Sequence, residues 1–354
     1  MNLRHLLSVS LLGCIASLPA HAVTYCVSDV SGLSAAFNSA NAADEGSSHE
    51  IRVRPGTYAV SAGLEFNPAG DKDSKDFSLT GGWNSDCSAR AINASATVFN
   101  GENGGVDADF RFFGNNTRYV VEGIRFINFD TLVVDDADCS IDCPYTDVIR
   151  VRYNEFRNGA SVHIRAKDAQ VLTVSNNLFA NLSPGSGLAV RLEYLNNETP
   201  PTISFNTVAG IACSNVAGNA LYVFTLRSGA TLHHNIVQQA GCASDIALGG
   251  QPVALRNNLY NTLSGVTPSV LAGNVVTPSP LFLSAAGGNY RLRESAPASP
   301  AIDAGLTPTQ AATLGLSAAV PSQDLDGPAG ARQIGIRYDI GAYESSINQS
   351  SILT

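Results

Sequence analysis

The sequence predicts an all-β fold, a single-stranded right-handed parallel β-helix with an N-terminal capping helix and a C-terminal capping region. Two observations predict this fold. A strand pattern recurs in register with a single asparagine, and the distance between the asparagines matches the length of one coil.

Five segments between residues 149 and 260 share the strand pattern. Each has an apolar residue three positions before an asparagine, a polar residue two positions before it, and an apolar residue two positions after it. Alternation of period two is typical of a β-strand. The shared asparagines are Asn154, Asn177, Asn206, Asn235 and Asn258.

The steps between these asparagines are 23, 29, 29 and 23 residues. One coil of a parallel β-helix has about this length, whereas a helical repeat would show a period of about 3.6 residues within each unit. Stacked coils place equivalent residues ~4.8 Å apart, so the apolar columns form a core and the asparagines form a hydrogen-bonded ladder. Asparagine suits such a corner because it tolerates a left-handed backbone.

The N-terminal residues 1–22 have the layout of a signal peptide, with Arg4, an apolar run and Ala20-His21-Ala22 before the cleavage site. The alternative is a lipoprotein processed at Cys14. Later segments contain no run of about 20 apolar residues that would form a spanning helix. We therefore expect a secreted or periplasmic protein, and favour simple secretion over an outer-membrane lipoprotein.

The rest of the chain divides into four parts. A cap is expected over residues 23–50, because Ser31 is suited to be the N-cap of a helix to Ala40 with Leu33, Ala36, Phe37 and Ala40 on one face. Early coils begin at Ile51, Phe77 and Tyr119, and Ile124 takes the asparagine position in the last of them. The expected parts are the cap 23–50, the β-helix 51–283, a C-terminal cap region 284–344 and a tail 345–354.

The charge of the chain argues against one class of partner. Charged residues are 14% of the sequence, against about 25% in an ordinary soluble domain. The formal net charge is −9, and it becomes −10 when Arg4 leaves with the signal peptide. So acidic a chain is not expected to bind nucleic acid.

Six cysteines remain after removal of Cys14, and an even number in an exported chain indicates disulfides. Two of them each follow a ladder asparagine by seven residues, so stacking brings their Cα atoms within disulfide range. A second pair lies within an acidic loop, and the third remains by elimination. The expected disulfides are Cys213–Cys242, Cys139–Cys143 and Cys26–Cys87.

Two stretches of the chain carry a family resemblance. The segment through Ile51-Arg-Val-Arg-Pro-Gly-Thr-Tyr58 and Leu79-Thr-Gly-Gly-Trp-Asn84 resembles the opening of exported bacterial β-helix proteins of the pectate-lyase-like superfamily. Pro300-Ala-Ile-Asp-Ala-Gly305, Asp324-Leu-Asp-Gly327 and Asp339-Ile-Gly-Ala-Tyr-Glu344 are similar to the closing signature of the choice-of-anchor Q group. The resemblance implies binding of extended polysaccharides along an exposed strand face. The group shares an architecture and has no single activity.

An acidic loop is the first candidate site. Its carboxylates, Asp135, Asp136, Asp138 and Asp142, are candidate calcium ligands, and a pectate-lyase-like enzyme would use calcium to neutralise a uronate. The simpler interpretation is a solvated loop without metal, because the fixed spacing of a calcium-binding loop is absent.

The second candidate site is a set of strands that we expect to stack: Val162-His-Ile-Arg165, Val190-Arg-Leu-Glu193 and Phe224-Thr-Leu-Arg227. Arg165, Glu193 and Arg227 would alternate in sign, with His163 beside Arg191. Arg165 and Lys167, with His163, are candidate catalytic groups for β-elimination on a uronate. The structural alternative is a ladder of ion pairs between strands.

Glycosidase chemistry is less well supported. The resemblance extends to polygalacturonases, which carry Asn-Thr-Asp, Asp-Asp, Gly-His-Gly and Arg-Ile-Lys motifs. Only Asp135-Asp136 and, loosely, Arg165-Ala-Lys167 correspond to these. A lyase is therefore favoured over a hydrolase if the protein is an enzyme.

The sequence thus predicts a monomer that binds an extended, acidic polysaccharide at the cell envelope or outside the cell. Two alternatives remain open, a calcium-assisted polysaccharide lyase and an adhesin-like structural surface protein.

Overall fold

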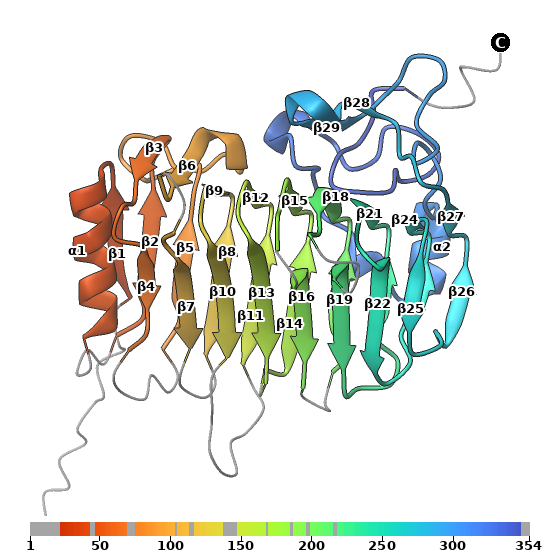
Figure 1. The fold of residues 1–354 in the computed structure, drawn as a ribbon. Helices are drawn as coiled ribbons and strands as arrows, with labels where there is room; N and C mark the ends of the chain where they lie inside the picture. The colour runs from red at the N-terminus through yellow and green to blue at the C-terminus, as the bar shows by residue number, and fades with distance from the viewer. Residues whose placement is uncertain are drawn as a thin grey trace, which may run out of the picture.

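Three parallel sheets wind around one core in the computed structural model, which describes residues 22–42, 47–68, 75–102, 105–112, 117–136, 147–167, 169–184, 187–195, 199–214 and 218–347. Each coil contributes one strand to sheet A, one to sheet B and one to sheet C in turn, so every strand pairs with its equivalents in the adjacent coils (Figure 1). The architecture is the expected right-handed parallel β-helix.

The strands of the three sheets are as follows. Sheet A has β1 (Val23–Val27), β2 (His49–Val53), β5 (Phe77–Thr80), β8 (Arg118–Glu122), β11 (Val148–Arg152), β14 (Val171–Ser175), β17 (Thr202–Ser204), β20 (Thr231–His233), β23 (Ala254–Arg256) and β26 (Val270–Ala272). Sheet B has β3 (Gly56–Ala59), β6 (Thr97–Asn100), β9 (Arg125–Ile127), β12 (Glu155–Arg157), β15 (Leu178–Ala180), β18 (Thr207–Ala212), β21 (Ile236–Ala240), β24 (Leu259–Tyr260) and β27 (Val275–Val276). Sheet C has β4 (Leu64–Phe66), β7 (Ala108–Phe112), β10 (Thr131–Asp136), β13 (Ser161–Ala166), β16 (Leu188–Tyr194), β19 (Asn219–Thr225), β22 (Ser244–Gly250) and β25 (Leu263–Gly265).

The N-terminal end of the stack is covered by helix α1 (Val30–Asn41) (Figure 1). The expected face, Leu33, Ala36, Phe37 and Ala40, is buried. The helix begins earlier than expected, because the Asp29 carboxylate accepts a hydrogen bond from the Gly32 N–H at 2.7 Å and is the N-cap in place of Ser31. Strand β1, in the segment assigned to the cap, pairs in parallel with β2, so sheet A begins at Val23.

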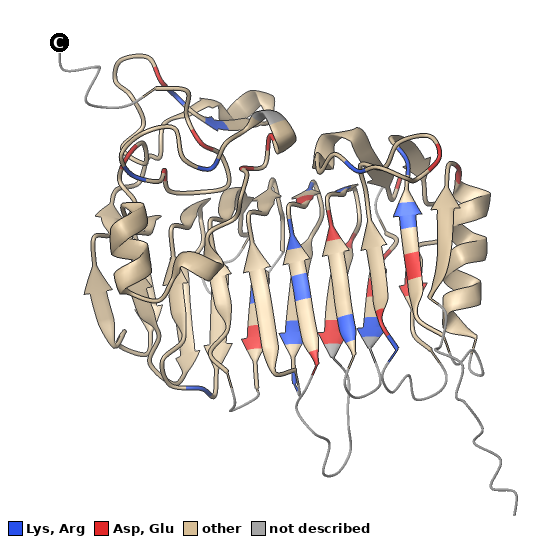
Figure 2. Cartoon of the chain, turned by 180° about the vertical axis from the view of Figure 1, so that it is seen from behind, with Lys and Arg blue, Asp and Glu red and all other residues tan. Residues whose placement is uncertain are grey.

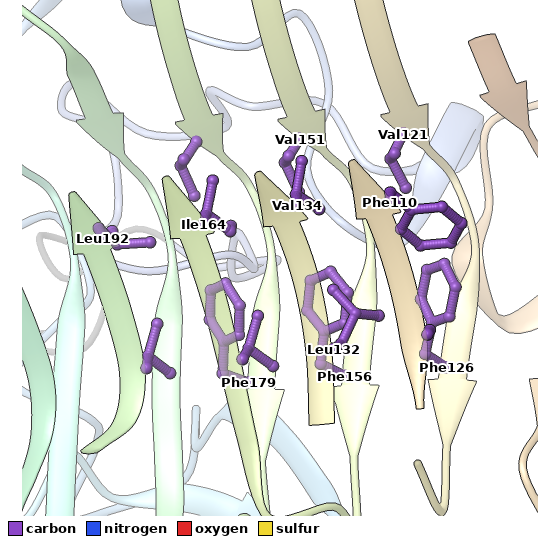
Figure 3. Packing of buried hydrophobic residues seen from close by; sticks show 14 of the residues in the cluster. Phe110, Val121, Phe126, Leu132, Val134, Val151, Phe156, Ile164, Phe179 and Leu192 are labelled. Carbon is purple, nitrogen blue, oxygen red and sulfur yellow. The ribbon is translucent and has the colours of Figure 1, made fainter. Parts of the chain in front are cut away.

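The core consists of columns of like side chains, because each inward position of a strand lies beside its equivalent in the next coil. Phe126, Phe156 and Phe179 stack with ring centroids 5.3 and 5.0 Å apart and nearly parallel planes (Figure 3). Val121 and Val151, on adjacent strands of sheet A, are buried in the same core (Figure 3). Burial of these columns supplies the main stabilisation of the stack.

The asparagine ladder is present at the corner between sheets A and B. Asn206 illustrates its geometry: its side-chain amide donates to the Val174 carbonyl and to Asn235 Oδ1, both at 2.9 Å. Its own Oδ1 accepts from the N–H and the side-chain amide of Asn177 at 3.1 and 3.0 Å. Five ladder asparagines are buried: Asn154, Asn177, Asn206, Asn235 and Asn258.

The ladder differs from the expectation in two respects. It extends by one more coil to Asn274, whose Oδ1 accepts from the Asn258 N–H at 2.9 Å. The left-handed backbone lies at the residue before each asparagine, as at Tyr153 with φ 56° and Phe205 with φ 55°. The asparagine itself is instead oriented along the stack by its hydrogen bonds. At the start of the ladder Ile124 takes the asparagine position, and its N–H donates to Asn154 Oδ1 at 3.1 Å.

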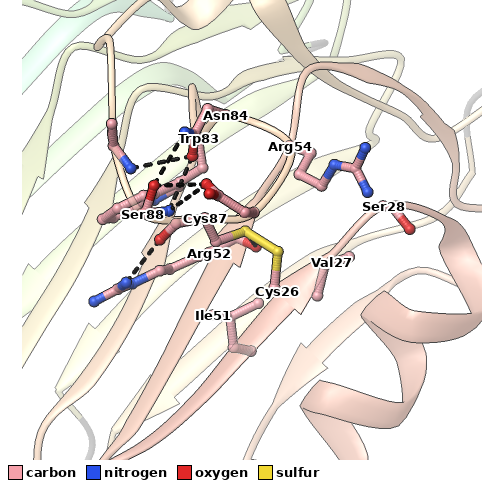
Figure 4. The surroundings of a disulfide bond; sticks show 12 residues. Cys26, Val27, Ser28, Ile51, Arg52, Arg54, Trp83, Asn84, Cys87 and Ser88 are labelled. Atoms are coloured by element: carbon pink, nitrogen blue, oxygen red, sulfur yellow. Dashed lines mark hydrogen bonds between the residues drawn. A yellow bond between two sulfur atoms is a disulfide. The ribbon is translucent and has the colours of Figure 1, made fainter.

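Two disulfides are formed as expected. Cys26–Cys87 ties β1 to the segment after β5, with Cα atoms 5.7 Å apart, and Arg52 donates a hydrogen bond to the Cys87 carbonyl at 2.8 Å (Figure 4). Cys213–Cys242 joins consecutive coils with Cα atoms 5.0 Å apart. The predicted pair Cys139–Cys143 lies outside the described residues.

The C-terminal region follows β27 and folds back along the stack. It contains the antiparallel pair β28 (Phe282–Ser284) and β29 (Asn289–Leu292), helix α2 (Pro308–Thr313) and short 3₁₀ turns η2 (Ala285–Gly287), η3 (Ser317–Ala319) and η4 (Gly327–Ala329). The Ala342 N–H donates to Thr207 Oγ1 of β18 at 3.0 Å, and the Gly341 N–H donates to the His234 carbonyl at 2.8 Å. This region therefore covers the outer face of sheet B in the middle and late coils.

Candidate functional site

The outer face of sheet C carries the residues that the sequence singled out. Adjacent strands β7, β10, β13 and β16 each present polar side chains outward, because their alternate residues are buried. Seen from the side of sheet A, charged residues on the strands lie in the N-terminal and middle coils and are sparse toward the C-terminal end (Figure 2). We call the following set the charged strip: Asp109, Arg111, Asp135, His163, Arg165, Arg191 and Glu193.

Arg165 and Asp135 form the centre of the charged strip. They lie directly opposite each other on β13 and β10. Arg165 Nε and Nη2 donate to the two Asp135 oxygens at 2.6 and 2.5 Å, which is the forked geometry of a strong arginine–carboxylate pair. The Asp135 side chain is 11% exposed and that of Arg165 is 34% exposed. The carboxylate is thus buried beneath the guanidinium.

Glu193 organises the neighbouring part of the charged strip. It lies beside Arg165, as expected, and its carboxylate binds Arg191 at 2.5 Å and His163 Nε2 at 3.0 Å. Its side chain is 10% exposed, against 43% for Arg191. Burial raises the pKa of Glu193, but the hydrogen bonds from Arg191 and His163 outweigh burial and leave that pKa below its ordinary value.

The environment of His163 favours its neutral form. Burial lowers the pKa of its imidazole, and this effect exceeds the opposing attraction of Glu193. A neutral imidazole hydrogen-bonded to a carboxylate is the arrangement of a general base. Lys167 follows β13 and is half-buried just beyond this strand.

The expected stacking of Arg227 on Glu193 is wrong. The residue beside Glu193 is Phe224, and Tyr222 lies beside Arg191, so the strand is displaced by three residues from the predicted alignment. Arg227 lies beyond β19, where its N–H donates to Thr225 Oγ1 at 3.0 Å. Alternation could not reveal this register, because the outward residues Tyr222 and Phe224 are aromatic and alternate with apolar inward residues.

Tyr222 and Phe224 form an aromatic pair that extends the charged strip toward the C-terminal end. Their ring centroids are 6.4 Å apart, and both side chains are half-buried. The next strand has Gly249 beside Phe224, and a Cβ there would lie 2.5 Å from the Tyr222 hydroxyl and 2.8 Å from the Phe224 ring. Both rings therefore lie against Gly249, where the side chain of any other residue would collide with them.

The structure describes only part of the predicted calcium site. Of the four candidate ligands, Asp135 has both oxygens bound by Arg165. The Asp136 side chain, Asp138 and Asp142 lie outside what the structure describes. Across the described ranges, no three or more His, Cys, Asp or Glu side chains are grouped so as to hold a metal ion. The calcium site therefore stays a prediction.

The fold and the charged strip together define a parallel β-helix protein with ion pairs and aromatic side chains on one outer face. Compared with known proteins, the chain matches no family model, no curated protein and no solved structure. Among the residues that the structure describes, no helix is long and apolar enough to cross a membrane.

Proposed function

We propose that this protein is an exported β-helix protein that binds an extended, acidic polysaccharide along the outer face of sheet C. The observation that carries the proposal is the layering of the charged strip. Its carboxylates Asp135 and Glu193 lie beneath arginines, so a ligand meets the guanidinium groups of Arg165 and Arg191 first.

Guanidinium groups bind uronate carboxylates in a bidentate manner and remain charged at every physiological pH. Arg165 and Arg191 lie on neighbouring strands, β13 and β16, which are about 4.8 Å apart in a sheet. This row runs along the axis of the stack, as an extended chain would. Tyr222 and Phe224 continue the row with apolar ring surface, on which a sugar ring can pack.

The resemblance of the sequence to the pectate-lyase-like superfamily and the choice-of-anchor Q group supports the same proposal. Two disulfides fit an oxidising compartment, which supports export by residues 1–22 to the periplasm or the medium. An adhesin-like structural role remains the third alternative, and it would not require the charged strip.

The test measures retention of the mature chain on polygalacturonate, alginate and hyaluronan by affinity electrophoresis. Arg191→Gln removes an exposed guanidinium and leaves Glu193 bound to His163, and we expect at least ~10-fold weaker binding. Arg118→Gln is the matched control, because Arg118 is an exposed arginine of sheet A. Equal retention of the two variants, or no retention of the parent protein, would overturn the proposal.

A lyase is the second candidate function, and His163 is the observation that favours it. In β-elimination a base removes the proton on the carbon next to the uronate carboxyl. The bond to the leaving oxygen then breaks, that oxygen takes up a proton, and a carbon–carbon double bond forms. The neutral imidazole beside Glu193 is suited to accept the proton, and Arg165 is suited to bind the carboxylate.

The lyase assay follows the ultraviolet absorbance of the unsaturated product on the same polysaccharides, with calcium and with a chelator. A lyase predicts an absorbance rise that His163→Ala abolishes while glycan retention persists. Retention without any rise in absorbance would exclude the lyase and leave the binding function.

A further inference from the structure

A polar cleft of about 170 Å³ lies away from the charged strip, on the outer side of sheet B. Strands β9 and β12 form its floor, β29 and the turn at Asp326 form one wall, and the 3₁₀ turn η1 (Ala94–Ala96) forms the other. The cleft is smaller than the ~300–1,000 Å³ typical of pockets for drug-sized ligands. Its charged lining residues are Arg125, Glu155, Arg157, Arg291 and Asp326.

The floor is built around a buried carboxylate. Glu155 accepts from Arg125 Nε and Nη2 at 2.9 and 3.0 Å and from Arg157 Nε at 2.6 Å. Its side chain is 5% exposed, whereas that of Arg125 is 28% exposed. As in the charged strip, the carboxylate lies below and the cations face the open space.

The wall adds a third cation. Arg291 binds both oxygens of Asp326 through Nε and Nη2. Arg157 lies over the ring of Tyr290, 5.7 Å from its centroid, and donates to the Gly288 carbonyl at 2.8 Å. Arg157 therefore ties the floor to the wall.

Each arginine keeps donors that its carboxylate does not use. Arg125 Nη1, Arg157 Nη2 and Arg291 Nη1 have no hydrogen-bond partner in the described part of the chain. Three guanidinium groups face two carboxylates here, so the cleft has an excess of one positive charge in a chain of net charge −9. Two arginines would be enough to neutralise Glu155 and Asp326. Neutralisation of these carboxylates therefore does not explain the third arginine.

The two walls are held together at one end of the cleft. Gln323 donates to the Ile92 carbonyl at 3.2 Å. Gly327 has φ +85°, and a Cβ there would lie 2.4 Å from the same carbonyl oxygen. The C-terminal region is thus packed directly against the segment before η1 at this end of the cleft.

We infer that this cleft binds a small oxyanion, either free or as the acidic group of a monosaccharide. Arg125, Arg157 and Arg291 supply charged donors for a carboxylate, sulfate or phosphate. Asn93, Ser95 and Asn289 also line the cleft and supply neutral groups for sugar hydroxyls. This site is separate from sheet C and does not depend on the polysaccharide function.

Isothermal titration of the mature chain with sulfate, phosphate, galacturonate and galactose tests the inference at constant ionic strength. We expect the oxyanions to bind and galactose not to bind. Tighter binding of galacturonate than of sulfate would identify an acidic sugar, and the reverse would identify a free inorganic anion.

Arg291→Gln is the main variant, because Arg291 is half exposed and its loss leaves the floor intact. We expect at least ~10-fold weaker oxyanion binding, and the same for Arg125→Gln, which leaves Arg157 on Glu155. Arg118→Gln is the control, because Arg118 lies on sheet A outside both the cleft and the charged strip, and it should bind oxyanions like the parent protein. Unchanged binding in both cleft variants, or no binding of any oxyanion beyond that of chloride, would overturn the inference whatever the polysaccharide experiment shows.

Discussion

Each buried asparagine of the ladder satisfies polar groups at a corner where the strands do not pair. A buried N–H or carbonyl without a partner costs about 1–3 kcal/mol. Asn206 partners the Asn177 N–H and the Val174 carbonyl at once. The ladder therefore also offsets the unfavourable left-handed backbone of bulky residues such as Phe205.

Asn206→Ala is expected to destabilise the protein by about 3 kcal/mol or more, because at least two buried backbone groups lose their partner. Asn274→Ala is the comparison. Asn274 lies at the end of the ladder and is partly exposed, so water replaces its hydrogen bonds and the loss should be about 1 kcal/mol. Urea denaturation of both variants measures the difference, and equal losses would contradict a role for burial in the ladder.

At the residue scale, the sequence was sufficient to predict the ladder positions, because one asparagine recurs between two apolar columns. It did not reveal that Asn274 continues the ladder, since the last step is shorter than the others. The N-cap at Asp29 was also missed, because Asp29 and Ser31 are both good caps and only the path of the chain decides between them.

At the scale of elements, the strands of neighbouring coils are joined side by side, and the disulfide Cys213–Cys242 fixes two of these coils covalently. The register of sheets A and B follows directly from the asparagine column. The register of sheet C does not, because the segments between the sheets vary in length. In β19 the outward residues Tyr222 and Phe224 are aromatic, so the alternation of polar and apolar residues does not show which side of the strand faces inward.

Replacing both Cys213 and Cys242 by serine should destabilise the protein by roughly 3–4 kcal/mol, since the closed loop spans 29 residues. Differential scanning calorimetry should show a lower Tm for the double variant than for the parent protein. Reducing agent should lower the Tm of the parent protein by more than it lowers the Tm of the double variant. The parent loses both Cys213–Cys242 and Cys26–Cys87, whereas the variant has only Cys26–Cys87 of these two bonds to lose. A double variant with the parent's Tm would argue against this pairing.

At the scale of the whole molecule, the C-terminal region is held on the stack by a buried polar cluster. Arg332 donates to the Gly341 and Ala342 carbonyls, contacts Asn176 and lies 3.6 Å from Glu344. Burial raises the pKa of Glu344 to about 9, outweighing the attraction of Arg332, and Asp339 adds to the shift. Packing of this kind joins distant parts of the sequence, so local patterns did not predict it.

Docking of the C-terminal region should therefore weaken as pH rises from 7 to 9. The folded pKa of Glu344 lies above its unfolded value, so its contribution is complete below the unfolded pKa and is lost as pH rises through about 9. We expect a loss on the order of 2 kcal/mol over this range. Burial lowers the pKa of His233 to about 3 and that of His234 well below its ordinary value, so neither histidine titrates in the folded protein between pH 7 and 9.

Hydrogen exchange of the C-terminal region across this range of pH, corrected for the intrinsic exchange rate, measures the effect. Glu344→Gln keeps the shape of the side chain and removes the titration, so its protection should change little between pH 7 and 9. The same pH dependence in this variant and in the parent protein would assign the effect to another group.

The hydrogen bond from the Gln323 side chain to the Ile92 carbonyl joins residues that are 231 positions apart in the chain. Coils of a β-helix contact only their neighbours, so the stack can grow one coil at a time as the polypeptide is made. The C-terminal region breaks this rule, since its last segments are synthesised after every coil and yet pack on one of the first. The coils of this protein can therefore assemble early, but the contact between the C-terminal region and the early coil forms only after Gln323 has been synthesised.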